Sequence, residues 1–469
     1  MSETVSPVEQ LAPVHFIGIS GIGMSALARL LLARGVEVRG SSDRRNAIVD
    51  RLEAEGARVA IGHDAHNLGD ARTVVVSSAI AQANPELVEA RARGLRVEGR
   101  GALLASLMNP MRGLAVAGTH GKTTTTAMLA SVFEAAGLDP TVAVGGEIVA
   151  TGSNARAGNG PWFVTESDES DGSFLDLHPR IAVVTNVEND HVASDAEFAV
   201  LLGSFATFLE GLGEGCTAVV GTDNPAAAEL AARPRTARTV TFGFGDADVT
   251  ARAVAYADFG SGFDLHAGDL RIGRIALHVP GAINVQNALA AAASAIAAGV
   301  GFDGIAAGLE RFQGVRRRFE IIARTPRMTI VDDYAHHPTA VEATIATARA
   351  YWDGPIVVAF EPHRYTRTRY LAREFALALR GADQVLLAPV YAASEPPMPG
   401  VGAATIGEPL RAMGCDVAYV DRVADVPDAV LRMAPEGSLV LVLGAGSITD
   451  AARGLARLVA SAADGAPAA

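Results

Sequence analysis

The chain has 469 residues, of which 49% are hydrophobic and 19% are charged. A chain of this length is too long to fold around one hydrophobic core, which predicts about three domains. The composition is that of a globular rather than a disordered protein. The formal net charge of −13 argues against a general nucleic-acid-binding surface, so an anionic ligand would need a local basic pocket.

The two cysteines, Cys216 and Cys415, are too few for a disulfide framework or a zinc site. The N-terminal residues lack the basic and apolar regions of a signal peptide. The longest weakly polar run, residues 288–300, is too short to span a bilayer and is typical of a buried helix. We therefore expect a cytoplasmic protein with no membrane insertion.

Strands and helices alternate in the first part of the chain, which predicts a parallel sheet with right-handed crossovers. Turn residues at 109–113 interrupt this pattern, and we expect the first domain to end there. The predicted elements of this part are strands at 14–17, 36–38 and 73–76 and helices at 24–33 and 48–55.

A glycine loop follows the first predicted strand. Gly18, Gly21 and Gly23 match the spacing of a dinucleotide-binding fingerprint, with Ser20 in place of its second glycine. Asp43 follows about 20 residues later in the sequence, which is the usual spacing of an acid that binds the ribose. The pattern favours nucleotide binding without saying which nucleotide, so a nicotinamide-dependent dehydrogenase stays open. A tight turn that serves only helix–sheet packing is the structural alternative.

The sequence AGTHGKTTTT at 117–126 lies between an apolar run and a segment with helical spacing. A strand, a glycine turn and a helix that opens with Lys-Thr form an anion cradle of backbone N–H groups. Lys122 would add a point charge, and the Thr123 hydroxyl can hold Mg²⁺. Val116 occupies the place of the first glycine of the standard motif, so the match is incomplete.

An acidic stretch follows the predicted strand at 162–164. Glu166, Asp168, Glu169 and Asp171 would repel one another unless some of them met a cation. Their place at the carboxyl end of a strand favours Mg²⁺ coordination beside the phosphates, because Mg²⁺ takes hard oxygen ligands. A solvated acidic loop is the alternative.

The motif TNVENDH at 185–191 follows the predicted strand at 181–184, and its position favours a site role for His191. Asn284 and Asn287 open the alanine-rich helix. They would either cap that helix or contact a nucleotide base or ribose.

The last part of the chain repeats the alternating pattern. DDYAHHP at 332–338 and PHRYTRTR at 362–369 directly follow predicted strands. Arginines and histidines are ill-suited to a packed core but suit an anionic substrate, such as a carboxylate held by Arg. A solvated helix face is the alternative. The remaining predicted elements are strands at 329–331, 356–360, 384–387 and 439–442, a helix at 198–209, and β-rich repeats around residues 240 and 275.

Taken together, these motifs resemble the Mur ligase family over about residues 13–455. The ordered set, which also includes ESDESDGSFLDLHP at 166–179 and RRF at 317–319, resembles most the member that adds alanine. The resemblance implies an α/β fold of three domains, in which two Rossmann-like parallel sheets flank a central P-loop ATPase-like domain. The expected boundaries are residues 1–110 for the UDP-sugar domain, 111–315 for the ATP domain and 316–469 for the C-terminal domain.

The resemblance implies an ATP- and Mg²⁺-dependent ligase that joins L-alanine to the carboxylate of UDP-N-acetylmuramate in peptidoglycan precursor synthesis. It assigns the ATP phosphates to Gly118, Thr119, His120, Gly121, Lys122, Thr123 and Thr124. It assigns one metal to Thr123 and Glu166, a second to His191, and the adenosine end to Asn284, Asn287, Arg318 and Asp333. The reacting carboxylate and alanine would face His336, His363, Arg364 and Arg367, and the UDP moiety would face Gly18, Gly21, Gly23 and Asp43.

The chain departs from the family at three places. Ser20 replaces a usual glycine, and Ser42 stands at the place of the acid, with Asp43 one residue later. Residues 282–283 are Ala-Ile where Arg-His is common. A recycling ligase that attaches a preformed tripeptide, a dehydrogenase and a regulatory P-loop protein are the alternatives. We expect no nucleic-acid partner and a monomer or homodimer.

Overall fold

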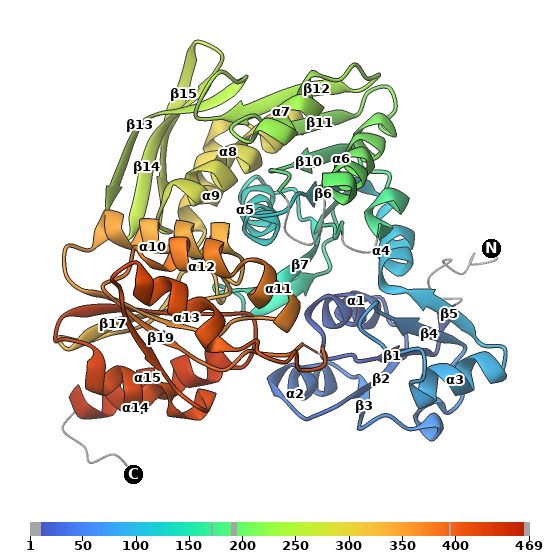
Figure 1. Ribbon diagram of the computed structural model, residues 1–469. Helices are drawn as coiled ribbons and strands as arrows, with labels where there is room; N and C mark the ends of the chain where they lie inside the picture. The colour runs from blue at the N-terminus through green and yellow to red at the C-terminus, as the bar shows by residue number, and fades with distance from the viewer. Residues whose placement is uncertain (1–10, 170–171, 189–194, 394, 464–469) are drawn as a thin grey trace, which may run out of the picture. The chain divides into compact units, whose positions relative to one another are not determined.

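The computed structural model describes residues 11–169, 172–188, 195–393 and 395–463. Three sheets, each with its own helices, form the architecture (Figure 1). The chain divides into two compact units, the first formed by Met1–Val254, Phe263–Ala276 and Val285–Gln313, and the second by Ala255–Gly262, Leu277–Asn284 and Gly314–Ala469.

The first sheet has five parallel strands in the order β3-β2-β1-β4-β5. Its central strand is buried along its whole length, which suits a parallel strand covered on both faces. The elements are β1 (Val14–Ile17), α1 (Ile22–Ala33), β2 (Val38–Ser42), α2 (Ala47–Ala54), β3 (Arg58–Ile61), the 3₁₀ helix η2 (Ala65–Leu68), β4 (Thr73–Val76), α3 (Pro85–Ala92), β5 (Arg96–Gly99) and α4 (Arg100–Met108).

The second sheet has ten strands in the order β15-β14-β13-β12-β11-β10-β6-β9-β7-β8, and β6 pairs in parallel with β9 and β10. One cluster of buried apolar side chains includes residues of the first sheet, of its helices and of the second sheet. These parts of the two sheets belong to the first unit. The elements are β6 (Arg112–Ala117), α5 (Lys122–Ala135), β7 (Thr141–Ile148), β8 (Ser153–Arg156), β9 (Trp162–Glu166), the 3₁₀ helix η3 (Ser173–Asp176), β10 (Ile181–Val184), α6 (Asp195–Glu210), β11 (Thr217–Gly221), α7 (Pro225–Ala232), β12 (Arg238–Gly243), β13 (Val249–Ala257), β14 (Gly260–Ala267), β15 (Leu270–Leu277), α8 (Ala282–Ala297) and α9 (Phe302–Arg311).

The third sheet has six strands in the order β16-β17-β21-β18-β19-β20, with the antiparallel β16 at its edge. Its strands β18 and β21 are completely buried. The elements are β16 (Glu320–Arg324), β17 (Met328–Asp333), α10 (Pro338–Tyr351), β18 (Ile356–Phe360), α11 (Tyr365–Tyr370), α12 (Ala372–Leu379), β19 (Gln384–Leu387), α13 (Ala403–Ala412), β20 (Asp416–Tyr419), the 3₁₀ helix η4 (Val423–Asp425), α14 (Val426–Met433), β21 (Ser438–Leu443) and α15 (Ile448–Ala463).

The central strands match the apolar runs of the sequence, and the edge strands do not. The expected strands at 14–17, 73–76 and 181–184 have these bounds in the structure. The strand expected at 36–38 was wrong, because β2 spans Val38–Ser42 and includes the buried Gly40. A Cβ at Gly40 would lie 2.7 Å from the Ile19 Cβ, so small residues are needed where an apolar run would be expected. The half-exposed edge strands β3 (Arg-Val-Ala-Ile) and β5 (Arg-Val-Glu-Gly) were not anticipated, because their apolar residues are few and each strand begins with an arginine.

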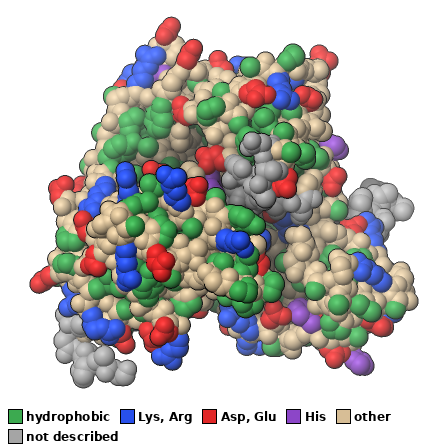
Figure 2. Space-filling model, viewed as in Figure 1, with side chains coloured by type: hydrophobic (Ala, Val, Ile, Leu, Met, Phe, Trp, Pro, Cys, Tyr) green, Lys and Arg blue, Asp and Glu red, His purple; other side chains and the backbone are tan. Residues whose placement is uncertain are grey.

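No helix within the described ranges combines the length and the apolar character needed to cross a bilayer. Acidic and basic side chains are interspersed over the face of the molecule shown in Figure 2.

Asp332, at the end of β17, carries a buried carboxyl group in the second unit. Its Oδ2 accepts a hydrogen bond from the Thr449 hydroxyl at 2.6 Å, and its Oδ1 lies 4.0 Å from the Arg317 Nε. Burial raises the pKa of Asp332 although the Thr449 hydrogen bond and the Arg317 charge act in the opposite direction.

We expect Asp332→Asn to raise the free energy of unfolding at neutral pH by about 1 kcal/mol. The folded wild type binds this proton more tightly than the unfolded chain, so its stability falls as pH rises through the raised pKa. The difference in unfolding free energy between variant and wild type should vanish below the pKa that Asp332 has in the unfolded chain, because Asp332 is then protonated in both the folded and the unfolded state. Urea unfolding between pH 3 and 8 measures it, with Asp353→Asn on the exposed surface as control. A variant that is less stable at every pH would contradict this account.

Candidate active site

The phosphate loop joins β6 to α5 and requires glycine at two positions. Gly118 and Gly121 have φ values of +128° and +83°. A Cβ on Gly118 would overlap the Thr185 hydroxyl, and one on Gly121 would overlap the Asn287 amide oxygen. No side chain caps the N-terminus of α5, so the backbone N–H groups of its first turn face the loop. Such a helix start is an anion-binding arrangement.

The loop after β10 holds the phosphate loop in shape. Because β10 is the parallel neighbour of β6, the loops at their carboxyl ends lie side by side (Figure 1). The Asn186 side chain accepts from the His120 N–H at 2.8 Å and donates to the His120 carbonyl at 3.1 Å. The Thr185 hydroxyl donates to the same carbonyl at 2.6 Å, and the Glu188 N–H donates to the Thr119 hydroxyl at 2.8 Å. The first part of the TNVENDH motif is therefore a scaffold for the phosphate loop.

Lys122 is held by a carboxylate. Its Nζ lies 2.9 Å from both carboxylate oxygens of Glu169 and donates to the Gly118 carbonyl at 2.5 Å. The Glu169 side chain is only 8% exposed, so this ion pair is shielded from solvent. Glu169 therefore binds the ammonium group of Lys122, the cation that an anion in the phosphate loop would contact. The sequence placed Glu169 in an acidic stretch but did not indicate this partner.

Thr123 and Glu166 come together beside the same loop. The Thr123 hydroxyl donates to Glu166 Oε2 at 2.8 Å, and Oε1 accepts from the Gly145 N–H. A hydroxyl and a carboxylate oxygen are hard donors that suit Mg²⁺, so the pair fits the expected metal. The described residues contain no cluster of three or more His, Cys, Asp or Glu side chains that could hold a metal. His191, expected at a second metal, lies outside the described residues.

The two asparagines of α8 have different partners. Asn284 donates from its amide nitrogen to the Pro280 carbonyl, just before the helix begins, at 2.7 Å. Asn287, in the first unit, is buried and accepts a hydrogen bond from the Thr125 hydroxyl at 3.3 Å. Asn287 therefore packs against the helix that carries the phosphate loop, while Asn284 stabilises its own helix start.

Asp333, in the second unit, fixes the turn after β17. Its carboxyl accepts from the Phe319 N–H at 2.6 Å and from the Ala335 N–H at 2.7 Å. Burial raises the pKa of Asp333 against the effect of the nearby Arg318 charge and of these hydrogen bonds. The Arg318 guanidinium lies 5.1 Å from the centre of the Tyr334 ring, and that of Arg317 lies 5.0 Å from it. The RRF and DDYAHHP motifs thus form one cluster.

Two histidines of the second unit, His336 and His363, form a row with two tyrosines. His336 lies 4.9 Å from the Tyr334 ring and 5.3 Å from the His363 ring, both in T-shaped geometry. Tyr391 stacks on the other side of His363 at 5.6 Å, although the sequence did not single it out. Arg367 is buried, with Nη1 3.5 Å from His363 Nδ1.

Arg364 directly precedes α11, with φ +69°, and is exposed. Arg367 lies inside this short helix and is buried, whereas Arg369, the third arginine of the PHRYTRTR motif, is exposed. Guanidinium groups suit an anionic carboxylate.

The glycine loop of the first sheet lies after β1. Gly18 has φ +75°, and the Ser20 hydroxyl contacts the Ser42 hydroxyl at 2.7 Å. Ser42 is buried at the end of β2, whereas Asp43 is exposed and pairs with His63 Nε2 at 2.9 Å. The acid that follows the second strand is thus oriented by a histidine that the sequence analysis missed. His63 stands alone after the edge strand β3, outside any motif, so the sequence did not indicate a role for it.

The buried carboxylate of Glu86 forms hydrogen bonds beside the glycine loop of the first sheet. Glu86 accepts hydrogen bonds from Ser41 at 2.6 Å and Asn67 at 2.6 Å, and lies 3.2 Å from His15 Nε2. Burial by itself would raise the pKa of Glu86, but these hydrogen bonds outweigh it and the pKa is lowered. Ser41 also contacts His63 Nδ1 at 2.9 Å, so the network extends to the histidine beside Asp43.

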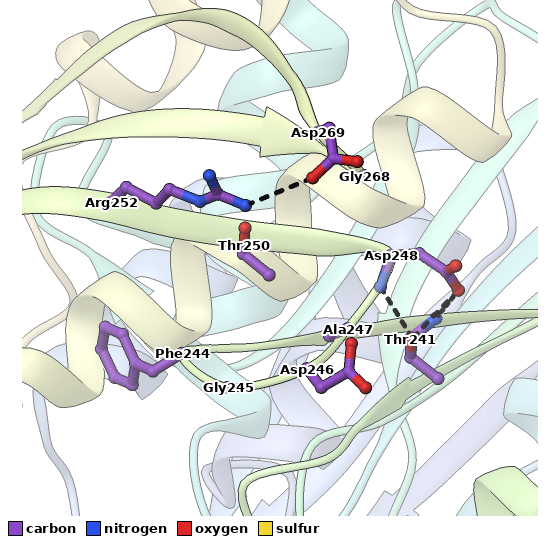
Figure 3. Close-up of a pocket in the computed structure, with 10 residues that line it drawn as sticks. All are labelled: Thr241, Phe244, Gly245, Asp246, Ala247, Asp248, Thr250, Arg252, Gly268 and Asp269. Carbon is purple, nitrogen blue, oxygen red and sulfur yellow. Dashed lines mark hydrogen bonds and ion pairs between the residues drawn. The ribbon is translucent and has the colours of Figure 1, made fainter.

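An open hollow lies elsewhere, at the turns after β12 and β14 (Figure 3). Its walls include the ion pair of Arg252 with Asp269 and the hydrogen bond from the Thr241 hydroxyl to Asp248. This hollow contains none of the residues expected at the active site from the sequence.

Three family models match the chain in succession. They are the Mur ligase family catalytic domain at residues 13–112, the Mur ligase middle domain at 116–295 and the Mur ligase glutamate ligase domain at 317–446.

Curated relatives match almost from end to end. UDP-N-acetylmuramate–L-alanine ligase of Thermobifida fusca (strain YX) is 46% identical over 466 residues, which cover 96% of this chain and 97% of that protein. The enzyme of the same name from Burkholderia cenocepacia (strain HI2424) is 44% identical over 451 residues, covering 93% and 95%.

Solved structures share the three-domain α/β fold. The UDP-N-acetylmuramate–alanine ligase of Thermotoga maritima has a TM-score of 0.83 at 29% identity and covers 96% of this chain and 99% of its own. A murein peptide ligase from Psychrobacter arcticus has a TM-score of 0.72 at 23% identity, covering 97% and 99%, and is similar in fold alone.

The ion pair of Lys122 with Glu169 leads to a binding prediction. We expect Glu169→Gln to lower the Kd for a non-hydrolysable ATP analogue about three- to tenfold, because the phosphates no longer compete with a carboxylate for Lys122. Isothermal titration calorimetry measures this, with Glu134→Gln on the far end of α5 as control. Weaker binding by Glu169→Gln would mean that the carboxylate supports the nucleotide directly.

Proposed function

The chain belongs to the Mur ligase family, and we propose that it joins L-alanine to the carboxylate of UDP-N-acetylmuramate with hydrolysis of ATP, in peptidoglycan precursor synthesis. The observation that carries this proposal is the similarity to curated L-alanine ligases, which extends over 96% of the chain at 46% identity. The phosphate loop supports it, because its Lys122 and its glycine geometry suit a nucleoside triphosphate.

The reaction activates a carboxylate, which is a poor electrophile at neutral pH. A carboxylate oxygen attacks the γ-phosphorus, so that ADP leaves and an acyl phosphate forms. The alanine amine then attacks the acyl carbon, and the tetrahedral intermediate expels phosphate. Both steps bring anions together, and we assign the neutralisation of that charge to Lys122 and to Arg364 and Arg367.

We assign the magnesium ion to Thr123 and Glu166, whose oxygens lie 2.8 Å apart at the phosphate loop. When bound, the ion would supply positive charge that neutralises the phosphates. His191 remains the proposed ligand of a second metal, by family resemblance alone.

We assign the remaining contacts by the same resemblance. Asn284, Asn287, Arg318 and Asp333 are proposed for the adenosine end, and Gly118, Thr119, His120, Gly121 and Thr124 join Lys122 and Thr123 at the phosphates. His336 and His363 are proposed at the carboxylate and alanine, and Gly18, Gly21, Gly23 and Asp43 at the UDP moiety. Asp333 already holds two backbone N–H groups, so it would act mainly by shaping its turn.

We propose three domains at residues 1–110, 111–315 and 316–469, and a site of action in the cytoplasm, as a monomer or homodimer. The first domain would carry the UDP-sugar and the second ATP. The proposal involves neither nucleic acid nor membrane insertion.

Phosphate release tests the function directly. With ATP and UDP-N-acetylmuramate, we expect release that requires L-alanine and is absent with the tripeptide alone, and we run a panel of other amino acids beside it. Lys122→Ala should abolish release while its circular dichroism spectrum stays that of the wild type, because the charge on the phosphates is lost. Release that needs the tripeptide would instead identify a recycling ligase, and a fully active Lys122→Ala variant would remove this loop from the reaction.

The metal assignment has its own test. We expect Glu166→Ala to raise the Mg²⁺ concentration for half-maximal phosphate release roughly tenfold or more, because the ion loses a carboxylate ligand. Glu134→Ala, on the same helix as the phosphate loop lysine, is the matched control. A Glu166→Ala titration curve that overlays the wild type would exclude this carboxylate as a ligand.

A further inference from the structure

Arg100 lies over the glycine loop of the first sheet. A Cβ built on Gly23 would lie 3.1 Å from the Arg100 Cδ and 3.3 Å from its Nη1, so this side chain covers the loop where a larger residue would clash. Arg100 is the first residue of α4, and the next residue, Gly101, packs so closely on Ser173 that a Cβ there would overlap it. The start of α4 is therefore held in place with its cation at the glycine loop.

The partner of Arg100 comes from the second sheet. Arg100 Nη2 donates to Asp168 Oδ2 at 3.2 Å, in a pair whose side chains are 21% and 45% exposed. The neighbouring residue, Glu169, binds Lys122. Two consecutive carboxylates after β9 thus bind the cations of two different glycine loops, all within the first unit.

Each of these cations lies beside a loop built for an anion. A guanidinium recognises phosphate oxygens bidentately, and a bound diphosphate would compete with Asp168 for it. The same competition holds between the ATP phosphates and Glu169 for Lys122. The two carboxylates are adjacent in the chain, so one short segment carries the partners of both cations.

We propose that Arg100 binds the diphosphate of the sugar nucleotide, that Asp168 is its resident competitor, and that residues 168–169 couple this site to the ATP site. The proposal rests on the function proposed above and adds a binding residue and a coupling to it. Sugar nucleotide that takes Arg100 from Asp168 makes Glu169 easier to displace from Lys122, so ATP binds more tightly. By linkage, ATP tightens the sugar nucleotide by the same factor.

Opposite effects of the two partners test the binding residue. Without ATP or alanine, calorimetry should give a Kd for UDP-N-acetylmuramate that rises roughly tenfold or more in Arg100→Ala, since a charge-assisted contact is lost. Asp168→Asn should lower the same Kd about threefold, because the competitor is gone. Arg96→Ala, an exposed arginine four residues earlier that pairs with Glu98, should leave it unchanged.

A purely structural bridge between Arg100 and Asp168 predicts that both variants weaken binding, and that result would overturn the proposal. An unchanged Kd in Arg100→Ala would do the same. Thermal unfolding shows whether Arg100→Ala is folded, and Asp168→Asn decides the matter independently, since only competition predicts tighter binding. If the wild type itself does not bind UDP-N-acetylmuramate, the proposed function fails, whereas normal wild-type binding with unaffected variants removes this inference alone.

The coupling is measured with a non-hydrolysable ATP analogue, titrated with and without saturating UDP-N-acetylmuramate. We expect the sugar nucleotide to lower the Kd of the analogue in the wild type and to have almost no effect on it in Asp168→Asn, where Arg100 no longer restrains the segment. A coupling factor of the same size in Asp168→Asn, or none in the wild type, would exclude residues 168–169 as the link.

Discussion

The parallel pairing of β6 with β9 on one side and β10 on the other is the constraint on which the proposed site depends. Parallel neighbours end at the same edge of a sheet, so the loops after these three strands meet. The start of α5 carries Lys122 and Thr123, the end of β9 and the residues after it carry Glu166 and Glu169, and the residues after β10 carry Asn186. Residues far apart in the chain thereby come together in the proposed anion- and metal-binding arrangement.

Close backbone approach gives this arrangement its precision. Gly118 and Gly121 adopt positive φ values at positions where the side chains of Thr185 and Asn287 leave no room for a Cβ. Asn186 then ties both the N–H and the carbonyl of His120. The cradle is therefore shaped by its neighbours before any phosphate arrives, which lowers the ordering cost of binding.

Electrostatic pairing is the second theme of the molecule. Lys122 and Arg367, which are proposed to face anions, lie close to a carboxylate and a histidine respectively. Buried carboxyls such as Asp333 and Glu86 instead hold backbone or side-chain donors and shape the edges of their sheets. The partners of a charged side chain, and not its residue type, therefore distinguish a charge proposed to meet an anion from one that stabilises the local structure.

The sequence by itself determined the strand, glycine turn and helix of the phosphate loop and the central strands, because glycine spacing, a Lys-Thr pair and buried apolar runs are local signals. The pairing of Thr123 with Glu166 was expected from the family resemblance, and these side chains are hydrogen-bonded in the structure. The tertiary structure decided which carboxylate meets which cation. Glu166 and Glu169 are alike in sequence, yet one faces Thr123 and the other Lys122. The edge strands β3 and β5, His63 and Arg100 were not predicted, because their partners are set by packing between segments distant in the chain.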